Sequence, residues 1–270
     1  SESYINSELG TDTINTDWQK EVYQYGYIRK YEVSAAGGND KTNFFMSGSY
    51  NNEDGIIINT GMRRLTGRIN LNHKASEKFS FGTKITLAHT YQQIPHDLLS
   101  NANEVYGSYT LSPNIPVKKN DSTYYFDNST FNVVGCSNLD KTTNTTNRLL
   151  ANAYVEYKPT KKLTFKSVNG IDYIHFSQNQ FISPQTPDGA NKNGIIIKGL
   201  SIENTVTSSN TVQYNSKIGT NHNVDLVGGY EIQYSKNDST LVGASNFPTS
   251  NIRALNTGSN IERLKTPVSD

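Results

Sequence analysis

Between Met62 and Lys74 the chain alternates between polar side chains and apolar or small ones. The polar series consists of Arg64, Thr66, Arg68, Asn70, Asn72 and Lys74, and the other series contains Leu65, Gly67, Ile69 and Leu71. Successive side chains of a β-strand point to opposite faces of its sheet, so a period of two predicts a strand with one apolar face and one polar face. The polar face carries three cations, and the fold must provide a suitable environment for them.

The same alternation recurs along the chain and predicts eight strands. They span residues 28–36, 42–51, 63–74, 79–91, 148–157, 163–177, 204–218 and 224–235. In the sixth strand the apolar face is interrupted by Ser167 and Asn169. At about 3.3 Å per residue and a tilt of about 40°, roughly ten to twelve residues climb about 25–30 Å, the height of the apolar band of an outer-membrane barrel.

Short and long connections alternate between these strands. The short ones are rich in Gly, Asn, Asp, Pro or Lys, as tight turns are, and cover 37–41, 75–78, 158–162 and 219–223. The long ones cover 52–62, 92–147, 178–203 and 236 to the end. In an antiparallel meander all tight turns then lie at one end and all long loops at the other, which is typical of outer-membrane β-barrels.

The composition excludes several classes of protein. Hydrophobic residues make up 34% of the chain, and no apolar run approaches the roughly 18 residues of a membrane-spanning helix. The net charge of +1 provides no basic excess to attract nucleic acid. Cys136 is the only cysteine, so no internal disulfide can form, and we expect it to be an inert small residue in a loop.

A soluble antiparallel β-sandwich also alternates and is the main alternative fold. Its inner faces should be larger and more aliphatic than Gly67, Ala151 and Gly228 allow. We therefore predict an all-β fold, namely an antiparallel transmembrane β-barrel segment of about eight strands. The alternative is a soluble extracellular β-sandwich that binds carbohydrate or acts as an adhesin.

The barrel interpretation assigns the two faces of residues 63–74. A charge on the lipid face costs about 2–4 kcal/mol near the bilayer midplane, so three charges on one strand belong inside. The residues expected to face the lumen are Arg64, Arg68 and Lys74. The residues expected to face lipid are Leu65, Ile69 and Leu71.

Both ends of the predicted meander lie on the side of the long loops, whereas a complete bacterial barrel normally starts and ends in the periplasm. Three charges on one inner face also favour a barrel wider than a small one filled by side chains. We therefore expect residues 1–270 to be part of one larger outer-membrane β-barrel domain, with further strands of that domain absent from this chain.

Four blocks of sequence carry a resemblance to a known family. They are NTDWQ at 15–19, YEVSAAGGNDKTNFF at 31–45, GSYNNEDGI at 48–56 and RLTGRINL at 64–71. In order and spacing they resemble the early barrel of SusC/RagA-type TonB-dependent outer-membrane transporters. The resemblance is dense over 15–91 and weaker over 148–235. It implies a 22-stranded barrel with an N-terminal plug that is absent here, and energy supplied through TonB. It also implies pairing with a SusD-like surface lipoprotein and import of glycans or peptides.

Two aromatic groups are candidate functional residues. Tyr124, Tyr125 and Phe126 lie within the long 92–147 connection, where they could contact ligand beyond the bilayer or pack within a folded loop. The second group precedes the first strand and consists of Trp18, Tyr23, Tyr25 and Tyr27. We interpret these as aromatics of the membrane interface, with a sugar-stacking platform as the alternative.

Catalytic and metal sites are not expected. The five histidines show no pair at metal-ligand spacing, and His96 followed by Asp97 is the nearest approach to a catalytic dyad, without a nucleophile motif. Residues 188–194 resemble a calcium loop but lack its final Glu and include Lys192, so we interpret them as a turn. The sequence therefore predicts a non-enzymatic protein without cofactor or metal.

Overall fold

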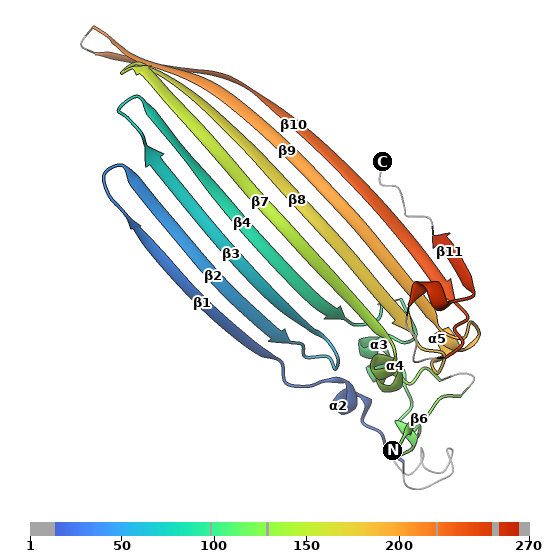
Figure 1. The fold of residues 1–270 in the computed structure, drawn as a ribbon. Helices are drawn as coiled ribbons and strands as arrows, with labels where there is room; N and C mark the ends of the chain where they lie inside the picture. Colours follow the sequence, from blue (N-terminus) through green and yellow to red (C-terminus); the bar gives the residue numbers. More distant parts are fainter. Residues whose placement is uncertain (1–13, 98, 128–129, 220, 250–253, 265–270) are drawn as a thin grey trace.

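The computed structural model describes residues 14–97, 99–127, 130–219, 221–249 and 254–264. A large antiparallel sheet dominates it, with small helices gathered at one end (Figure 1). The nine strands of this sheet follow the order β1-β2-β3-β4-β7-β8-β9-β10-β11, so sheet neighbours are also successive strands of the sheet along the chain. No helix in the described part of the chain is long and apolar enough to cross a membrane.

All eight predicted strands are present, and each is longer than predicted. They are β1 (Tyr27–Gly38), β2 (Thr42–Asp54), β3 (Gly61–Lys74), β4 (Phe79–Ile94), β7 (Lys141–Thr160), β8 (Leu163–Ile182), β9 (Ile195–Ile218) and β10 (His222–Ser245). Most of the extra residues lie at the long-loop end, where polar stretches such as 141–147 lack alternation. The ladder continues through them because the backbone N–H and C=O groups pair with the neighbouring strands whatever the side chains are.

The remaining elements, which the sequence analysis did not predict, lie before β1 and in the long connections. They are α2 (Trp18–Val22), α3 (Glu104–Thr110), β5 (Lys118–Asn120), β6 (Thr123–Tyr124), α4 (Val133–Leu139), α5 (Pro187–Ala190), η1 (Leu255–Thr257) and β11 (Asn260–Leu264). The side chains of Asn103 and Asn132 accept hydrogen bonds from the first turns of α3 and α4. These helices have at most seven residues, too few for a helical period to be visible in the sequence.

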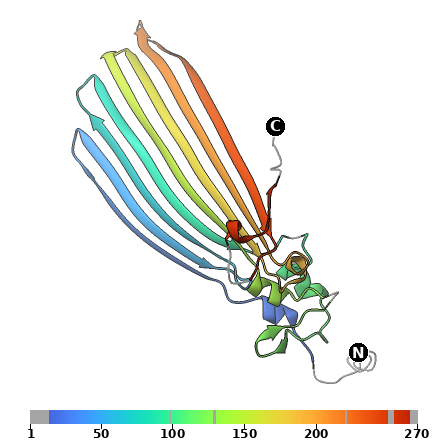
Figure 2. The same ribbon diagram turned by 45° about the vertical axis from the view of Figure 1, so that its right-hand side comes forward.

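The predicted separation of turns and loops is confirmed. In Figures 1 and 2 the tight turns lie at one end of the sheet, while the helices and long connections gather at the other. The last tight turn includes Thr220, which lies outside the described residues.

The strand register places the apolar series of all eight long strands on one face. Residues opposite each other in an antiparallel pair share a face, so a row across the sheet can be followed from strand to strand. One such row is Ala35, Met46, Ile69, Ile85, Ala151, Ile171, Val206 and Tyr234. The neighbouring row on the other face is Ser34, Ser47, Arg68, Thr86, Leu150, Asp172, Thr205 and Ser235. We call these the apolar face and the polar face.

The apolar face is not covered by the described part of the chain. Leu65 is 58% exposed, Ile69 49% and Tyr230 63%, and the buried clusters lie at the loop end of the sheet. A sandwich would bury these side chains against a second large sheet, and the second sheet described, β5–β6, is a two-stranded hairpin. The fold is therefore an antiparallel barrel segment, and the sandwich alternative is wrong.

Candidate functional site

The polar face carries charged and hydrogen-bonding side chains over most of its length. Arg148 forms a two-pronged ion pair with Asp172 on the next strand, with nitrogen–oxygen distances of 2.8 and 2.5 Å. The ammonium of Lys166 lies 5.3 Å from the ring centroid of Tyr154, whose hydroxyl donates to the Asn72 side chain at 3.0 Å. This face can therefore offer charges, amides and a phenol to a polar ligand.

The three predicted lumen residues lie on this face. Arg64, Arg68 and Lys74 occupy even-numbered positions along β3, and the register places Ser47 and Thr86 beside Arg68. Lys74 forms an ion pair with Glu77 in the adjoining turn at 2.8 Å.

The apolar face has an aromatic border at the end of the tight turns, which the sequence analysis missed. The ring centroids of Phe79 and Phe81 are 6.2 Å apart, and Phe79 lies opposite Tyr157, which lies opposite Phe165. Aromatic rings at this position are typical of a membrane interface. The signal was present in the sequence as aromatics beside the turns at 75–78 and 158–162.

The polar side chains that interrupt the apolar face, Ser167 and Asn169, form a hydrogen bond with each other. The Asn169 amide donates to the Ser167 hydroxyl at 3.1 Å, and Asn210 donates to Ser208 at 3.1 Å on the neighbouring strand. Paired polar groups cost much less in an apolar environment than unpaired ones, so this patch is compatible with the apolar face.

The structure corrects the prediction for Trp18. Its side chain is 3% exposed, packs with Val22, Val133 and Val134, and donates from Nε1 to the Ser112 carbonyl at 3.0 Å. The ring therefore fills the core of the loop cluster, because helix α2 turns it toward α4 rather than outward.

The other three aromatics of this group differ in exposure. Tyr23 forms an isolated β-bridge with Ile57, whereas Tyr25 and Tyr27 are 88% and 57% exposed. Tyr27 and Tyr25 also line an open hollow at the loop end of the sheet.

The aromatic run in the 92–147 connection lies beside helix α4. Tyr124 is half-buried and packs against the core that contains Trp18. The backbone N–H of Tyr125 donates a hydrogen bond to the Val117 carbonyl, and its carbonyl accepts one from the Asn132 side chain. Phe126 packs over Gly135, where an added methyl group would approach the ring to 2.7 Å. These contacts hold the run in place at the loop end.

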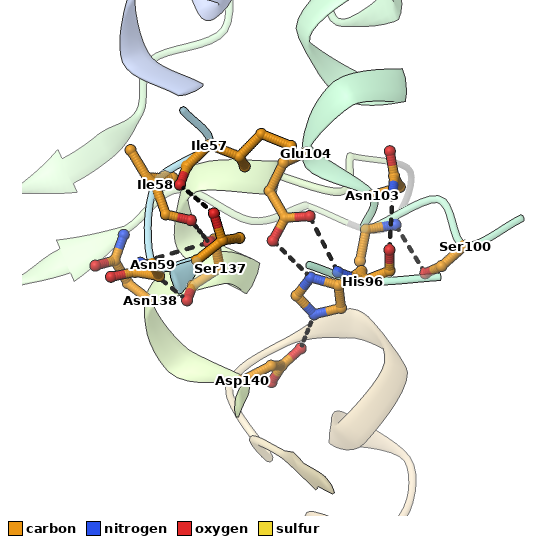
Figure 3. Close-up of polar contacts among 12 residues, drawn as sticks. Ile57, Ile58, Asn59, His96, Ser100, Asn103, Glu104, Ser137, Asn138 and Asp140 are labelled. Atoms are coloured by element: carbon orange, nitrogen blue, oxygen red, sulfur yellow. Dashed lines mark hydrogen bonds and ion pairs between the residues drawn. The ribbon is translucent and has the colours of Figure 1, made fainter. Parts of the chain in front are cut away.

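His96 joins three loop segments through two buried carboxylates (Figure 3). Its Nδ1 lies 2.9 Å from Glu104 Oε1 at the start of α3, and its Nε2 lies 3.2 Å from Asp140 Oδ2 at the end of α4. The other oxygen of Asp140 accepts from the Ser183 backbone at 2.7 Å and from the Thr186 hydroxyl at 3.1 Å, which ties in the connection after β8. We call these residues the His96 clasp.

The two carboxylates hold the imidazole in its charged form. Burial alone lowers the pKa of His96, but the hydrogen bonds that its ring nitrogens donate to Asp140 and Glu104, together with the negative charges of these groups, outweigh it and raise the pKa to about 9. Asp97 is not a partner of His96, since its carboxylate accepts from the Leu99 backbone. Both ring nitrogens are engaged, so the clasp is a structural cross-link rather than a base or a metal ligand.

Two further predictions concern chemistry at the loop end. Cys136 lies in helix α4 rather than in a loop, is 1% exposed, and burial raises the pKa of its thiol, so it is unreactive. Within the described ranges, no group of three or more His, Cys, Asp or Glu side chains could hold a metal ion.

Comparison with known proteins points to TonB-dependent receptors. The chain is 26% identical over 266 residues to TonB-dependent receptor P3 of Formosa agariphila, an alignment that covers 95% of this chain. It is 24% identical over 261 residues to TonB-dependent receptor SusC of Bacteroides thetaiotaomicron. The chain spans about a quarter of the length of these relatives, at 26% and 25%. No protein-family model matches it.

Solved structures agree in fold. The structure of the RagAB peptide importer in the "closed-closed" state matches with a TM-score of 0.71 at 18% identity, over 93% of this chain and 30% of that one. A second structure of the RagAB peptide transporter gives a TM-score of 0.73. The resemblance to SusC/RagA-type transporters is thus confirmed, and the chain is similar to a segment of their β-barrel.

Proposed function

We propose that residues 1–270 form part of the wall of a TonB-dependent transporter in the bacterial outer membrane. The observation that carries this proposal is the register, which collects the apolar side chains of eight strands on one exposed face and Arg64, Arg68 and Lys74 of β3 on the other. An exposed apolar face of this extent is costly in water and favourable in lipid. Similarity to receptors named TonB-dependent supports the same assignment.

In this proposal the chain is one part of a larger barrel domain. Strands β1 and β11 lie at opposite edges of the sheet and do not pair with each other among the described strands. Unpaired backbone groups in hydrocarbon cost several kcal/mol each, so further strands of the same domain complete the wall. A plug and the contact with TonB belong to other parts of the protein.

The cargo in this proposal is a glycan or a peptide, received together with a SusD-like surface lipoprotein. One similar solved structure is named a peptide importer, and the resemblance to SusC/RagA-type transporters implies glycans as the other class of cargo. Amides, hydroxyls and paired charges on the polar face can bind either cargo. Arg64, Arg68 and Lys74 face the transport path, and Tyr124, Tyr125 and Phe126 contact cargo or partner outside the membrane. The exposed rings of Tyr25 and Tyr27, together with Tyr23, lie near the outer membrane interface.

The function is tested by uptake. A strain that lacks the gene, and the same strain complemented with the full-length protein, are given fluorescent oligosaccharides and oligopeptides. The complemented strain should accumulate one of the two classes, and disruption of TonB should abolish that gain. Equal uptake by both strains, or a gain that survives loss of TonB, contradicts the proposal.

A further inference from the structure

The apolar face contains a furrow where two glycines meet. Gly48 of β2 and Gly67 of β3 lie directly opposite each other, and a methyl group built on either would meet no atom within 4 Å. The space they leave is a hollow of about 380 Å³. Its walls on the apolar face include Val33, Met46, Ile69, Ile85 and Leu87. We call this hollow the glycine furrow.

The furrow continues toward the loop end. A second hollow of about 610 Å³ shares Gly48, Gly67 and Leu87 with it and extends to Leu65 and His89. A third, of about 1050 Å³, shares Leu65 and His89 with the second. The three hollows therefore form one continuous track along the sheet, from the middle of the apolar band to its border.

The third hollow differs from the furrow in its chemistry. On the apolar face it is lined by Tyr27, Arg29, Arg63, Tyr91 and Lys141. Arg29 and Arg63 lie one row beyond Tyr31 and Leu65, where apolar side chains give way to polar ones. We call this hollow the basic hollow.

The basic hollow has an excess of positive charge. On the apolar face its lining holds three cations, Arg29, Arg63 and Lys141, and one carboxylate, Asp54. Asp54 lies 3.4 Å from Arg29, whose guanidinium also lies 5.9 Å from the ring centroid of Tyr27. The exposed side chains of Arg63 and Lys141 form no ion pair within the described part of the chain.

We propose that the glycine furrow and the basic hollow together bind one acylated anionic lipid of the outer leaflet. An acyl chain lies along Gly48 and Gly67, where the missing side chains leave room for it. A phosphate of the headgroup lies between Arg63 and Lys141, since guanidinium and ammonium groups form charge-assisted hydrogen bonds to phosphate. Tyr27 and Tyr91 flank it at the height where tyrosines favour a membrane interface.

This inference rests on the proposed function, because it requires the apolar face to meet lipid. Cargo is not the occupant that the site favours, since the track lies on the face opposite Arg64 and Arg68 and runs into the apolar band. The charge is complementary to an anionic headgroup, and the furrow to a hydrocarbon chain. A basic hollow or an apolar furrow alone would not identify a lipid, but the two together in one continuous track do.

Native mass spectrometry of the full-length protein tests the site. The delipidated protein in detergent is titrated with bisphosphorylated lipid A and, separately, with fully dephosphorylated lipid A. We expect R63Q/K141Q to weaken binding of bisphosphorylated lipid A at least about tenfold. We expect G67L to weaken binding of both forms of lipid A, because the leucine side chain fills the furrow. Matched controls on the polar face are K84Q and T86L, which should bind lipid A as the unmodified protein does. Assembly of each variant is checked by heat-modifiable gel mobility, and R63Q/K141Q alone suffices if G67L fails to assemble.

Several results would overturn the inference. If R63Q/K141Q binds bisphosphorylated lipid A as tightly as the unmodified protein does, the proposed phosphate site is wrong. The same holds if the unmodified protein binds both forms of lipid A equally. Full competition by millimolar inorganic phosphate indicates a free-anion site instead of a lipid site. TonB-dependent uptake can persist in all these cases, so failure of the lipid site is distinguishable from failure of the proposed transporter.

Discussion

His96 illustrates how one side chain can organise a loop region. Its imidazolium lies between Glu104 and Asp140, whose side chains are 2% and 3% exposed. Two buried carboxylates would be strongly destabilising without a cation between them. The histidine therefore acts as an internal counter-ion that holds α3 and α4 against the end of β4.

Replacement of His96 by Gln should loosen the loop cluster. Glutamine keeps a hydrogen-bond donor but removes the charge, so two buried carboxylates lose their counter-ion, at a local cost on the order of 3 kcal/mol. Hydrogen exchange of peptides within 96–140 should become faster, while exchange in β2 and β3 stays unchanged. Asp97→Asn, at the exposed neighbouring position, is the matched control. Equal protection in H96Q and the unmodified protein would falsify the clasp.

The clasp should also depend on pH. Since the pKa of His96 is raised to about 9 in the folded protein, its stabilisation is fully present below the unfolded pKa near 6.5 and is lost as pH rises through about 9. Burial and the charge of Asp140 also raise the pKa of Asp188, while the charge of His96 lowers it. Proteolysis of the 96–140 region should therefore be faster at pH 10 than at pH 7. In H96Q that difference should largely disappear.

At the scale of elements, the strands are longer than the membrane requires. An apolar band about 25 Å tall needs about ten residues of a tilted strand, whereas β9 and β10 have 24 each. Beyond the row of Tyr31 and Leu65, the apolar face turns polar on β7 and β8, as at Thr145 opposite Ser177. In the proposed barrel, the loop-end parts of these strands extend past the bilayer and carry the loop cluster.

Adding a charge to the apolar face of β3 and removing one from its polar face should affect barrel assembly differently. Ile69→Arg places a charge on the apolar face at a cost of about 2–4 kcal/mol near the midplane, whereas Arg68→Leu removes one from the polar face. We expect I69R to reduce assembly of the full-length barrel sharply and R68L to assemble normally. The readout is the heat-modifiable fraction on gels of outer-membrane preparations. Similar yields for the two variants would contradict the assignment of faces.

The molecule as a whole has a polarity from turns to loops (Figure 1). All described helices and both β5 and β6 lie at the loop end, while the tight turns lie at the other. In an outer-membrane barrel short turns face the periplasm and long loops face outward.

Cysteine labelling tests this orientation. Lys119, exposed in β5, and Lys161, exposed in the turn between β7 and β8, are replaced singly by Cys in a Cys136→Ala background. An impermeant maleimide added to whole cells should label position 119 and leave position 161 unlabelled until the outer membrane is opened. Labelling at 161 alone would mean that the orientation is inverted.

The open edges give a second prediction at this scale. Residues 1–270 produced alone should not refold into a monomeric, cooperatively melting barrel, because β1 and β11 leave rows of backbone groups unpaired. Circular dichroism melting in detergent and size-exclusion chromatography provide the measurement. A sharp melting transition of a monomer would contradict the interpretation of the chain as one part of a wall.

The sequence by itself determined the strands, the turns and the composition of the two faces. These features are local, because a period of two and a cluster of turn-forming residues can be read from neighbouring positions. The sequence alone therefore predicted correctly that Ile69 and Arg68 lie on opposite faces of the sheet.

Only the tertiary structure decided which distant residues meet. His96 meets Asp140 across 44 positions, Trp18 donates to Ser112 across 94, and Gly48 meets Gly67 only through the register of two strands. The aromatic character of Trp18 is equally suited to lipid interface and core, and only helix α2 and its partners select the core. Contacts of this kind leave no period in the sequence, because they depend on how the long connections fold over the end of the sheet.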